Sequence, residues 1–223
     1  MSTIRLERLA GVILADPPWA YRNWSDAVHG AARAHYDGQA VEDLARVPVA
    51  EWAAPDAILA MWATFPMLDQ GIRLCETWGF EHVTAIPWVK TVPSSGEIYR
   101  GVGFWAMASS ELLVLARRGA PKRVPVAERL GEQVIGLLAG EPRVVYAPRG
   151  KHSRKPLEVH AWLEAILPGP YLELYATQER TGWTCWGRAL GVWLDERGAS
   201  PCEPVAHDPK ARKAERLEPA RRG

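Results

Sequence analysis

The chain has 223 residues, of which 48% are hydrophobic and 24% charged, and its formal net charge is +1. This composition predicts one soluble globular domain, and no apolar run approaches the roughly 18 residues of a membrane span or forms a signal-peptide core, so we expect a cytoplasmic protein. Nor do the cysteines and histidines have the spacing of a disulfide framework or a metal site, so we expect no metal and interpret His160 as a surface residue.

Apolar runs alternate with helical patterns along the chain, which is typical of an α/β domain. The first strand, at 11–15, runs into two prolines that forbid both a longer central strand and an immediate helix. Further strands are expected at 57–62, 82–89, 110–116, 143–146 and 171–176. Helices are expected at 66–78, 126–139 and 156–167, and loops at 22–40 and 91–104.

Two stretches differ in composition from the rest. Large apolar residues almost disappear near Gly198, so we divide the chain into a domain at 1–197 and a disordered tail at 198–223. Between Arg117 and Lys155, ten basic residues stand against three acidic ones, a local charge of +7. This basic segment is suited to following a phosphate backbone, and the alternative is ordinary solvated loop charge.

The tetrapeptide Asp16-Pro17-Pro18-Trp19 follows the first strand, at the edge where open α/β sheets bind ligands. An amino group on an aromatic ring is a poor nucleophile, and the Asp16 carboxylate and the Pro17 carbonyl are suited to accept its two hydrogens. The prolines fix that geometry in advance, and Trp19, which we take to be exposed, would stack on a base. The alternative is a surface turn fixed by proline.

Longer motifs follow in a fixed order: "ADPPWAY", "HYDGQAVEDL", "ILAMWAT", "WGFEHVTAIPWVK", "GVGFWAMASSELLVLARRGAP", "HSRKPLEVHAWLEAILPGPYLELYA" and "GWTCWG". From about Val12 to Gly187 they resemble the S-adenosylmethionine-dependent N6-adenine methyltransferases typified by the catalytic subunit of messenger-RNA adenosine methyltransferase. The resemblance implies a Rossmann-like methyltransferase domain with a permuted motif order, in which the catalytic loop comes first and the cofactor motif last.

The resemblance also implies roles for individual residues. The catalytic residues would be Asp16, Pro17, Pro18 and Trp19. The target base would be bound by Tyr21, Tyr36, Trp62 and Trp105. S-adenosylmethionine would be bound by Asp16, Ser153, Lys155, Glu173, Tyr175, Thr177 and Glu179. Taken alone, Lys155 at a helix start is suited to hold a carboxylate, and its alternative is an exposed solvated lysine.

We therefore expect methyl transfer from S-adenosylmethionine to N6 of adenine in a nucleic acid, with DNA slightly favoured over RNA. The enzyme could act as a homo- or hetero-oligomer or as a single chain. One alternative is methylation of cytosine N4 or of a glutamine side chain. Another is a nucleic-acid-binding scaffold or partner subunit with an impaired cofactor pocket, because the segment 177–180 differs from the arginine-containing run that the family usually has there.

Overall fold

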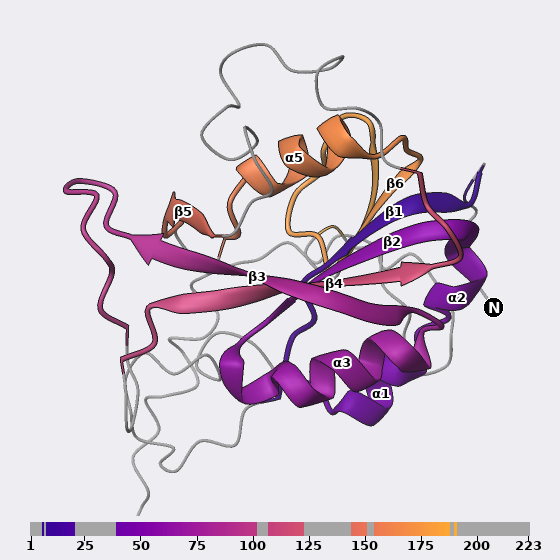
Figure 1. The fold of residues 1–223 in the computed structure, drawn as a ribbon, viewed down its shortest axis with the longest axis horizontal. Helices are drawn as coiled ribbons and strands as arrows, with labels where there is room; N and C mark the ends of the chain where they lie inside the picture. The colour runs from indigo at the N-terminus through magenta and orange to yellow at the C-terminus, as the bar shows by residue number, and fades with distance from the viewer. Residues whose placement is uncertain are drawn as a thin grey trace, which may run out of the picture.

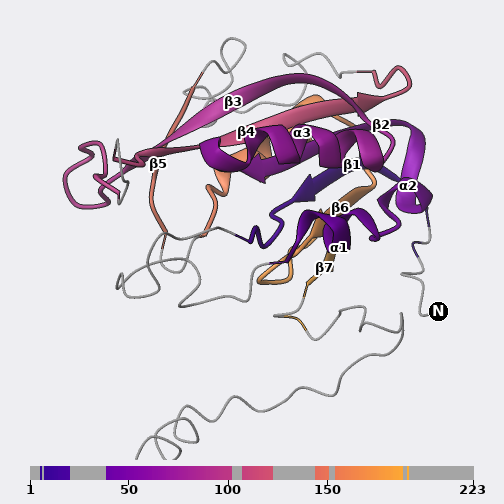
Figure 2. The same ribbon diagram turned by 90° about the horizontal axis from the view of Figure 1, so that it is seen from below.

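A single twisted sheet organises the computed structural model, which describes residue 6, residues 8–20, 39–101, 107–122, 144–150 and 154–187, and residue 190. Its strands run in the order β5-β3-β4-β2-β1-β6-β7 (Figures 1 and 2). They are β1 (Ala10–Ala15), β2 (Ala53–Ala63), β3 (Glu81–Thr91), β4 (Ser110–Arg118), β5 (Val145–Pro148), β6 (Tyr171–Leu174) and β7 (Trp183–Trp186). Only β4 runs antiparallel to its neighbours, so the other six strands point the same way.

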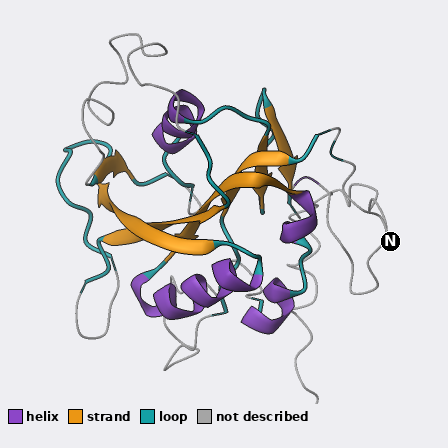
Figure 3. Cartoon of the chain, turned by 45° about the vertical axis from the view of Figure 1, so that its right-hand side comes forward, coloured by secondary structure: helices purple, strands orange, loops and turns teal. Residues whose placement is uncertain are grey.

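Helices cover both faces of this sheet, which gives three layers (Figures 1 and 3). They are α1 (Val41–Ala45), α2 (Val49–Trp52), the 3-10 turn η2 (Phe65–Met67), α3 (Leu68–Thr77) and α5 (Glu158–Ile166). The helices α1 and α3 lie on one face, as the view from below also shows (Figure 2), and α5 lies on the other. None of the described helices is both long and apolar enough to span a membrane.

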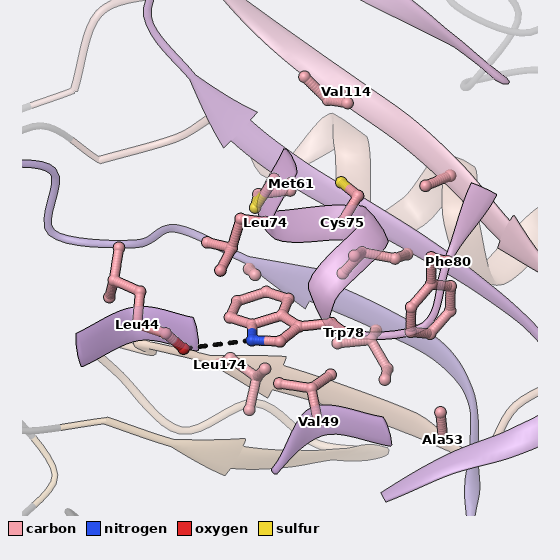
Figure 4. Close-up of a cluster of buried hydrophobic side chains, with 14 of the residues drawn as sticks. Leu44, Val49, Ala53, Met61, Leu74, Cys75, Trp78, Phe80, Val114 and Leu174 are labelled. Carbon is pink, nitrogen blue, oxygen red and sulfur yellow. Dashed lines mark hydrogen bonds between the residues drawn. The ribbon is translucent and has the colours of Figure 1, made fainter. Parts of the chain in front are cut away.

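Alternate side chains of β1 enter two separate hydrophobic cores, as the period of two in a strand requires. Ile13 packs with the core on the α3 side, and Leu14 packs with the core on the α5 side. On the α3 side, Trp78 donates its indole N–H to the Leu44 carbonyl at 3.2 Å, which joins α3 to α1 (Figure 4). The strand is therefore buried on both faces, which fixes the position of whatever follows it.

The centre of the sheet joins strands from opposite ends of the chain. β1 lies between β2, which follows it, and β6, which comes more than 150 residues later, and Ala15 is in register with both Met61 and Leu174. The carboxyl ends of β1 and β6 meet there, and the Asp16 N–H donates to the Leu174 carbonyl at 3.3 Å. Ligands of open α/β sheets bind at such a change of strand order.

The expected α/β architecture is confirmed, and the differences from the sequence-based expectation have local causes. β6 ends at Leu174, before the expected 176, because Tyr175 takes a left-handed backbone with φ of 64°. β5 lies at 145–148, two residues later than expected, and the sequence analysis missed β7, α1 and α2, which have only four or five residues each. The helix expected at 126–139 and the tail at 198–223 lie outside the described residues.

Replacing Leu163 with alanine is expected to lower the free energy of unfolding by about 2–5 kcal/mol, because its fully buried side chain fills the core between α5 and the sheet. Leu157→Ala, just before the same helix, is the matched control, because that side chain is 56% exposed and its loss is expected to change stability by less than about 0.5 kcal/mol. Urea unfolding of both variants measures the difference. Equal losses would contradict the packing described for α5.

Candidate active site

The loop after β1 is held by main-chain hydrogen bonds on both sides. The Trp19 N–H donates back to the Pro17 carbonyl at 2.9 Å, and Gln39 donates its N–H to the Pro18 carbonyl at 2.7 Å. Together with the bond from Asp16 to Leu174, these contacts tie the loop to β6 and to the segment before α1. The Asp16 carboxylate therefore projects from a backbone whose position is set before any ligand arrives.

Trp19 is not exposed, and that expectation is wrong. Its residue surface is only 6% accessible, it belongs to the core on the α3 side, and its indole N–H donates to the Trp62 carbonyl at 3.0 Å. Trp62 itself is 1% exposed and packs edge-to-face on Trp88 at 5.7 Å. Both rings support the loop and the strand beneath it, and neither offers a free face to a base in this structure.

Four charged side chains of alternating sign form a row beside the loop. Lys155 Nζ donates to both carboxylate oxygens of Asp16 at 2.8 Å and lies 3.3 Å from Glu111 Oε2. The other Glu111 oxygen, Oε1, accepts from Lys90 Nζ at 2.6 Å. The row carries no net charge, and Asp16 is its most accessible member, with 36% of its side chain exposed against 11–18% for the others.

The row shifts the proton affinity of its members. Burial raises the pKa of Asp16 and outweighs the attraction of Lys155, although solvent moderates the rise because a third of the side chain is accessible. Burial acts in the same direction at Glu111, but Lys155 and Lys90 outweigh it and hold the pKa of Glu111 below its ordinary value. Burial opposes the charge of Lys155, yet Asp16 and Glu111 raise its pKa well above the ordinary value. Lys155 and Glu111 thus stay charged, while Asp16 gains affinity for a proton.

The other residues expected at the cofactor lie along and after β6. Glu173 Oε2 lies 3.0 Å from His160 Nε2, and His160 is 5% exposed, so its interpretation as a surface residue is wrong. The Tyr175 ring is buried against Trp186, with 5.7 Å between ring centroids. Thr177 and Glu179 are exposed beyond the carboxyl end of β6. Within this set, the structure brings Asp16 and Lys155 into direct contact with each other.

Four of the expected site residues, Tyr21, Tyr36, Trp105 and Ser153, lie outside the described residues. Two members of the charged row, Lys90 and Glu111, were missed by the sequence analysis. The available signal was a charged residue inside an apolar strand pattern, since such residues are seldom buried unless they are paired. Among the described residues, no three His, Cys, Asp or Glu side chains are grouped to hold a metal ion.

Comparison with known proteins places this arrangement in a family. The MT-A70 family model matches residues 10–189, which include β1 to β7 and all four charged residues of the row. The chain belongs to the MT-A70 family. The resemblance expected from the motif order and the Rossmann-like methyltransferase fold are therefore confirmed.

Individual relatives differ in how much of their length this MT-A70 chain covers. The type II methyltransferase M.MunI of Mycoplasma sp is 29% identical over 194 residues, which are 79% of this chain and 76% of M.MunI. The N6-methyladenosine RNA methyltransferase MTA1 of Cryphonectria parasitica is 30% identical, over 79% of this chain and 50% of MTA1. The N(6)-adenine-specific methyltransferase METTL4 of Mus musculus is 28% identical, over 80% of this chain and 37% of METTL4. The chain thus spans most of M.MunI but half or less of the other two.

The residues present fit the cofactor that an MT-A70 methyltransferase implies. The methionine end of S-adenosylmethionine carries one ammonium and one carboxylate. Asp16 and Lys155 present the two opposite charges 2.8 Å apart, so each matches one group of that zwitterion. The pair lies where β1 and β6 end together, and the exposed Thr177 and Glu179 extend the same edge of the sheet.

Lys155→Met is expected to lower the free energy of unfolding at pH 7.5 by up to about 3 kcal/mol, because it leaves two carboxylates facing each other without their shared cation. The loss is expected to shrink as the pH falls. In the wild type, the lowered pKa of Glu111 stabilises the folded protein above its ordinary pKa of 4.5, and this contribution disappears as the carboxylate protonates. Removal of Lys155 raises the pKa of both carboxylates, so in the variant they protonate, and stop repelling each other, at a higher pH.

Urea unfolding at pH 7.5 and pH 5 measures both effects. Arg117→Met is the control, because Arg117 pairs with Glu81 on the surface, with side chains 51% and 70% exposed, and its loss is expected to cost less than about 1 kcal/mol at either pH. A Lys155 variant as stable as the control at pH 7.5 would contradict the role given to the row.

Proposed function

We propose that the protein transfers a methyl group from S-adenosylmethionine to N6 of adenine in a nucleic acid. The observation that carries the proposal is the Asp16 carboxylate, fixed by its loop at the junction of β1 and β6 and paired there with Lys155. Membership of the MT-A70 family supports the same chemistry. Relatives named for adenine N6 methylation, MTA1 and METTL4, support adenine over cytosine N4 or a glutamine side chain as the target.

In this proposal the loop holds the target amine by its two hydrogens. Asp16 accepts one, and the Pro17 carbonyl accepts the other through the lone pair that the Trp19 N–H leaves unused. Both acceptors belong to a backbone anchored by hydrogen bonds on each side, so little ordering is needed when the base arrives. Holding both hydrogens favours the pyramidal nitrogen whose lone pair can attack.

The reaction requires one bond to form, one to break and one proton to leave. When bound, S-adenosylmethionine would supply an electrophilic methyl group, with the sulfur retaining the electron pair of the broken bond as N6 forms the new one. The methylated nitrogen then becomes strongly acidic, and Asp16 is placed to take its proton. Burial has already raised the proton affinity of Asp16, and its accessible face allows the proton to pass to solvent.

We assign recognition of the base ring to residues other than Trp19 and Trp62, because both of these are buried. Tyr21, Tyr36 and Trp105 remain the proposed aromatic contacts. A base in a duplex would have to leave its stack to reach Asp16, at a cost of a few kcal/mol, whereas a single-stranded target avoids most of that cost. A single strand is therefore the better first substrate.

We expect DNA to be methylated more readily than RNA. The support is one of length: M.MunI, named a type II methyltransferase, is matched over 76% of its chain, whereas MTA1, named an RNA methyltransferase, is matched over half. A homo- or hetero-oligomer remains part of the same proposal.

The test is transfer of labelled methyl to unmethylated single-stranded DNA and to RNA in parallel, with nucleoside mass spectrometry to identify the product. We expect N6-methyladenine, and we expect Asp16→Asn to lower the rate at least about 100-fold because the amide cannot take the proton. Asp43→Asn is the matched control, since Asp43 pairs with Arg46 on the surface of α1. Absence of transfer to either polymer by the folded wild type would favour the scaffold alternative.

A further inference from the structure

In the charged row, Lys155 is paired with Asp16, the residue that the proposed reaction needs as an acceptor. Lys155 Nζ donates to both oxygens of Asp16 at 2.8 Å, so a cation neutralises the carboxylate in the ligand-free protein. The carboxylate has lone pairs left for an incoming amine, but it accepts a hydrogen bond and a proton most strongly when no cation neutralises it. Asp16 therefore becomes a stronger acceptor and base for the amine when Lys155 moves away from it.

We infer that Glu111 is a positioning residue: it takes Lys155 away from Asp16 when the target amine docks. The inference rests on the proposed methyl transfer, because it is that reaction which needs a free Asp16. Glu111 is not itself assigned any contact with the base or the reacting methyl group. It acts through Lys155, and Lys155 remains paired throughout.

The geometry around Glu111 suits this role. Its Oε2 already lies 3.3 Å from Lys155 Nζ, so a shift of about 0.5 Å brings the pair to the 2.8 Å of a charge-assisted hydrogen bond. Its Oε1 accepts a hydrogen bond from Lys90 at 2.6 Å. In the pairing of β3 with β4, Glu111 lies opposite Trp88, two residues before Lys90, so the two side chains are on the same face of the sheet. The carboxylate that receives Lys155 is therefore fixed in place.

Charge balance explains why a second carboxylate is needed. Lys155 is only 13% exposed, and moving a buried cation away from its partner leaves it uncompensated, which costs several kcal/mol. Glu111 on the other side keeps a protein carboxylate beside the ammonium, in addition to the cofactor carboxylate that Lys155 would hold. The Trp62 ring, with its centroid 5.8 Å from Nζ, adds an attraction for the ammonium.

Glu111→Gln is expected to keep Lys155 on Asp16 and to lower kcat about 10- to 100-fold, within the range that a misplacement of about 1 Å produces. The affinity for S-adenosylmethionine, measured by calorimetry, is expected to change less than about threefold, because Lys155 keeps its charge. Glu81→Gln is the matched control: it removes a carboxylate from β3 that pairs with Arg117 on the surface, and no change in kcat is expected.

A titration of the free protein gives a readout that does not depend on activity. Asp16 is acted on by Lys155 before α5, by Glu111 on β4 and by Glu173 on β6, and Lys90 on β3 faces it through Glu111. Removing the negative charge of Glu111 lowers the pKa of Asp16. Carbon-13 NMR of labelled aspartate carboxylates, assigned with Asp16→Asn, is expected to show this, and the low-pH limb of kcat/KM is expected to move in the same direction.

The outcomes separate this inference from the function on which it rests. An inactive wild type overturns both. If the wild type is active, three results overturn the inference alone. They are a Glu111→Gln variant as active as the wild type, an Asp16 pKa that is unchanged in that variant, and a loss of its cofactor affinity as large as its loss of kcat. If Glu111→Gln fails to fold, Lys90→Gln, which frees Glu111 from its anchor, is expected to lower kcat to a smaller extent, and unchanged kcat in that variant would also overturn the inference.

Discussion

The pairing of Asp16 with Lys155 is the interaction on which the rest of the site depends. The two residues lie 139 positions apart, and they meet because β1 and the segment before α5 converge at one edge of the sheet. A carboxylate and an ammonium that are largely removed from water need each other, since either one alone would be costly to bury. The same pair offers complementary charges to an amino-acid zwitterion, so folding stability and ligand binding draw on the same two groups.

The sheet supplies the precision that this pair requires. β1 is buried on both faces, and its neighbours β2 and β6 hold Ala15 in register from both sides. Trp19, placed in the core and bonded to the Trp62 carbonyl, fixes the loop from below. The apolar core thus sets the position of the carboxylate, and burial together with the charged row sets its pKa.

Much of this was predictable from the sequence, for reasons that also explain what was missed. Asp16 was predicted because it follows a strong strand signal and precedes two prolines, whereas the role of Lys155 was predicted from the family resemblance of its motif. Trp19 was misjudged because a local pattern beside a turn does not reveal what packs on a ring. Lys90 and Glu111 were missed because their contact depends on the register of β3 with β4, and the left-handed Tyr175 had no marker such as glycine.

Calorimetric titration with S-adenosylmethionine tests the central claim most directly, because it asks whether the Asp16–Lys155 pair is a binding site independently of any nucleic acid. The account predicts one cofactor per chain for the wild type and at least about tenfold weaker binding for Lys155→Met, which corresponds to about 1.4 kcal/mol. The surface variant Arg117→Met is expected to bind like the wild type. No heat from the folded wild type, or equal affinity in Lys155→Met, would contradict it.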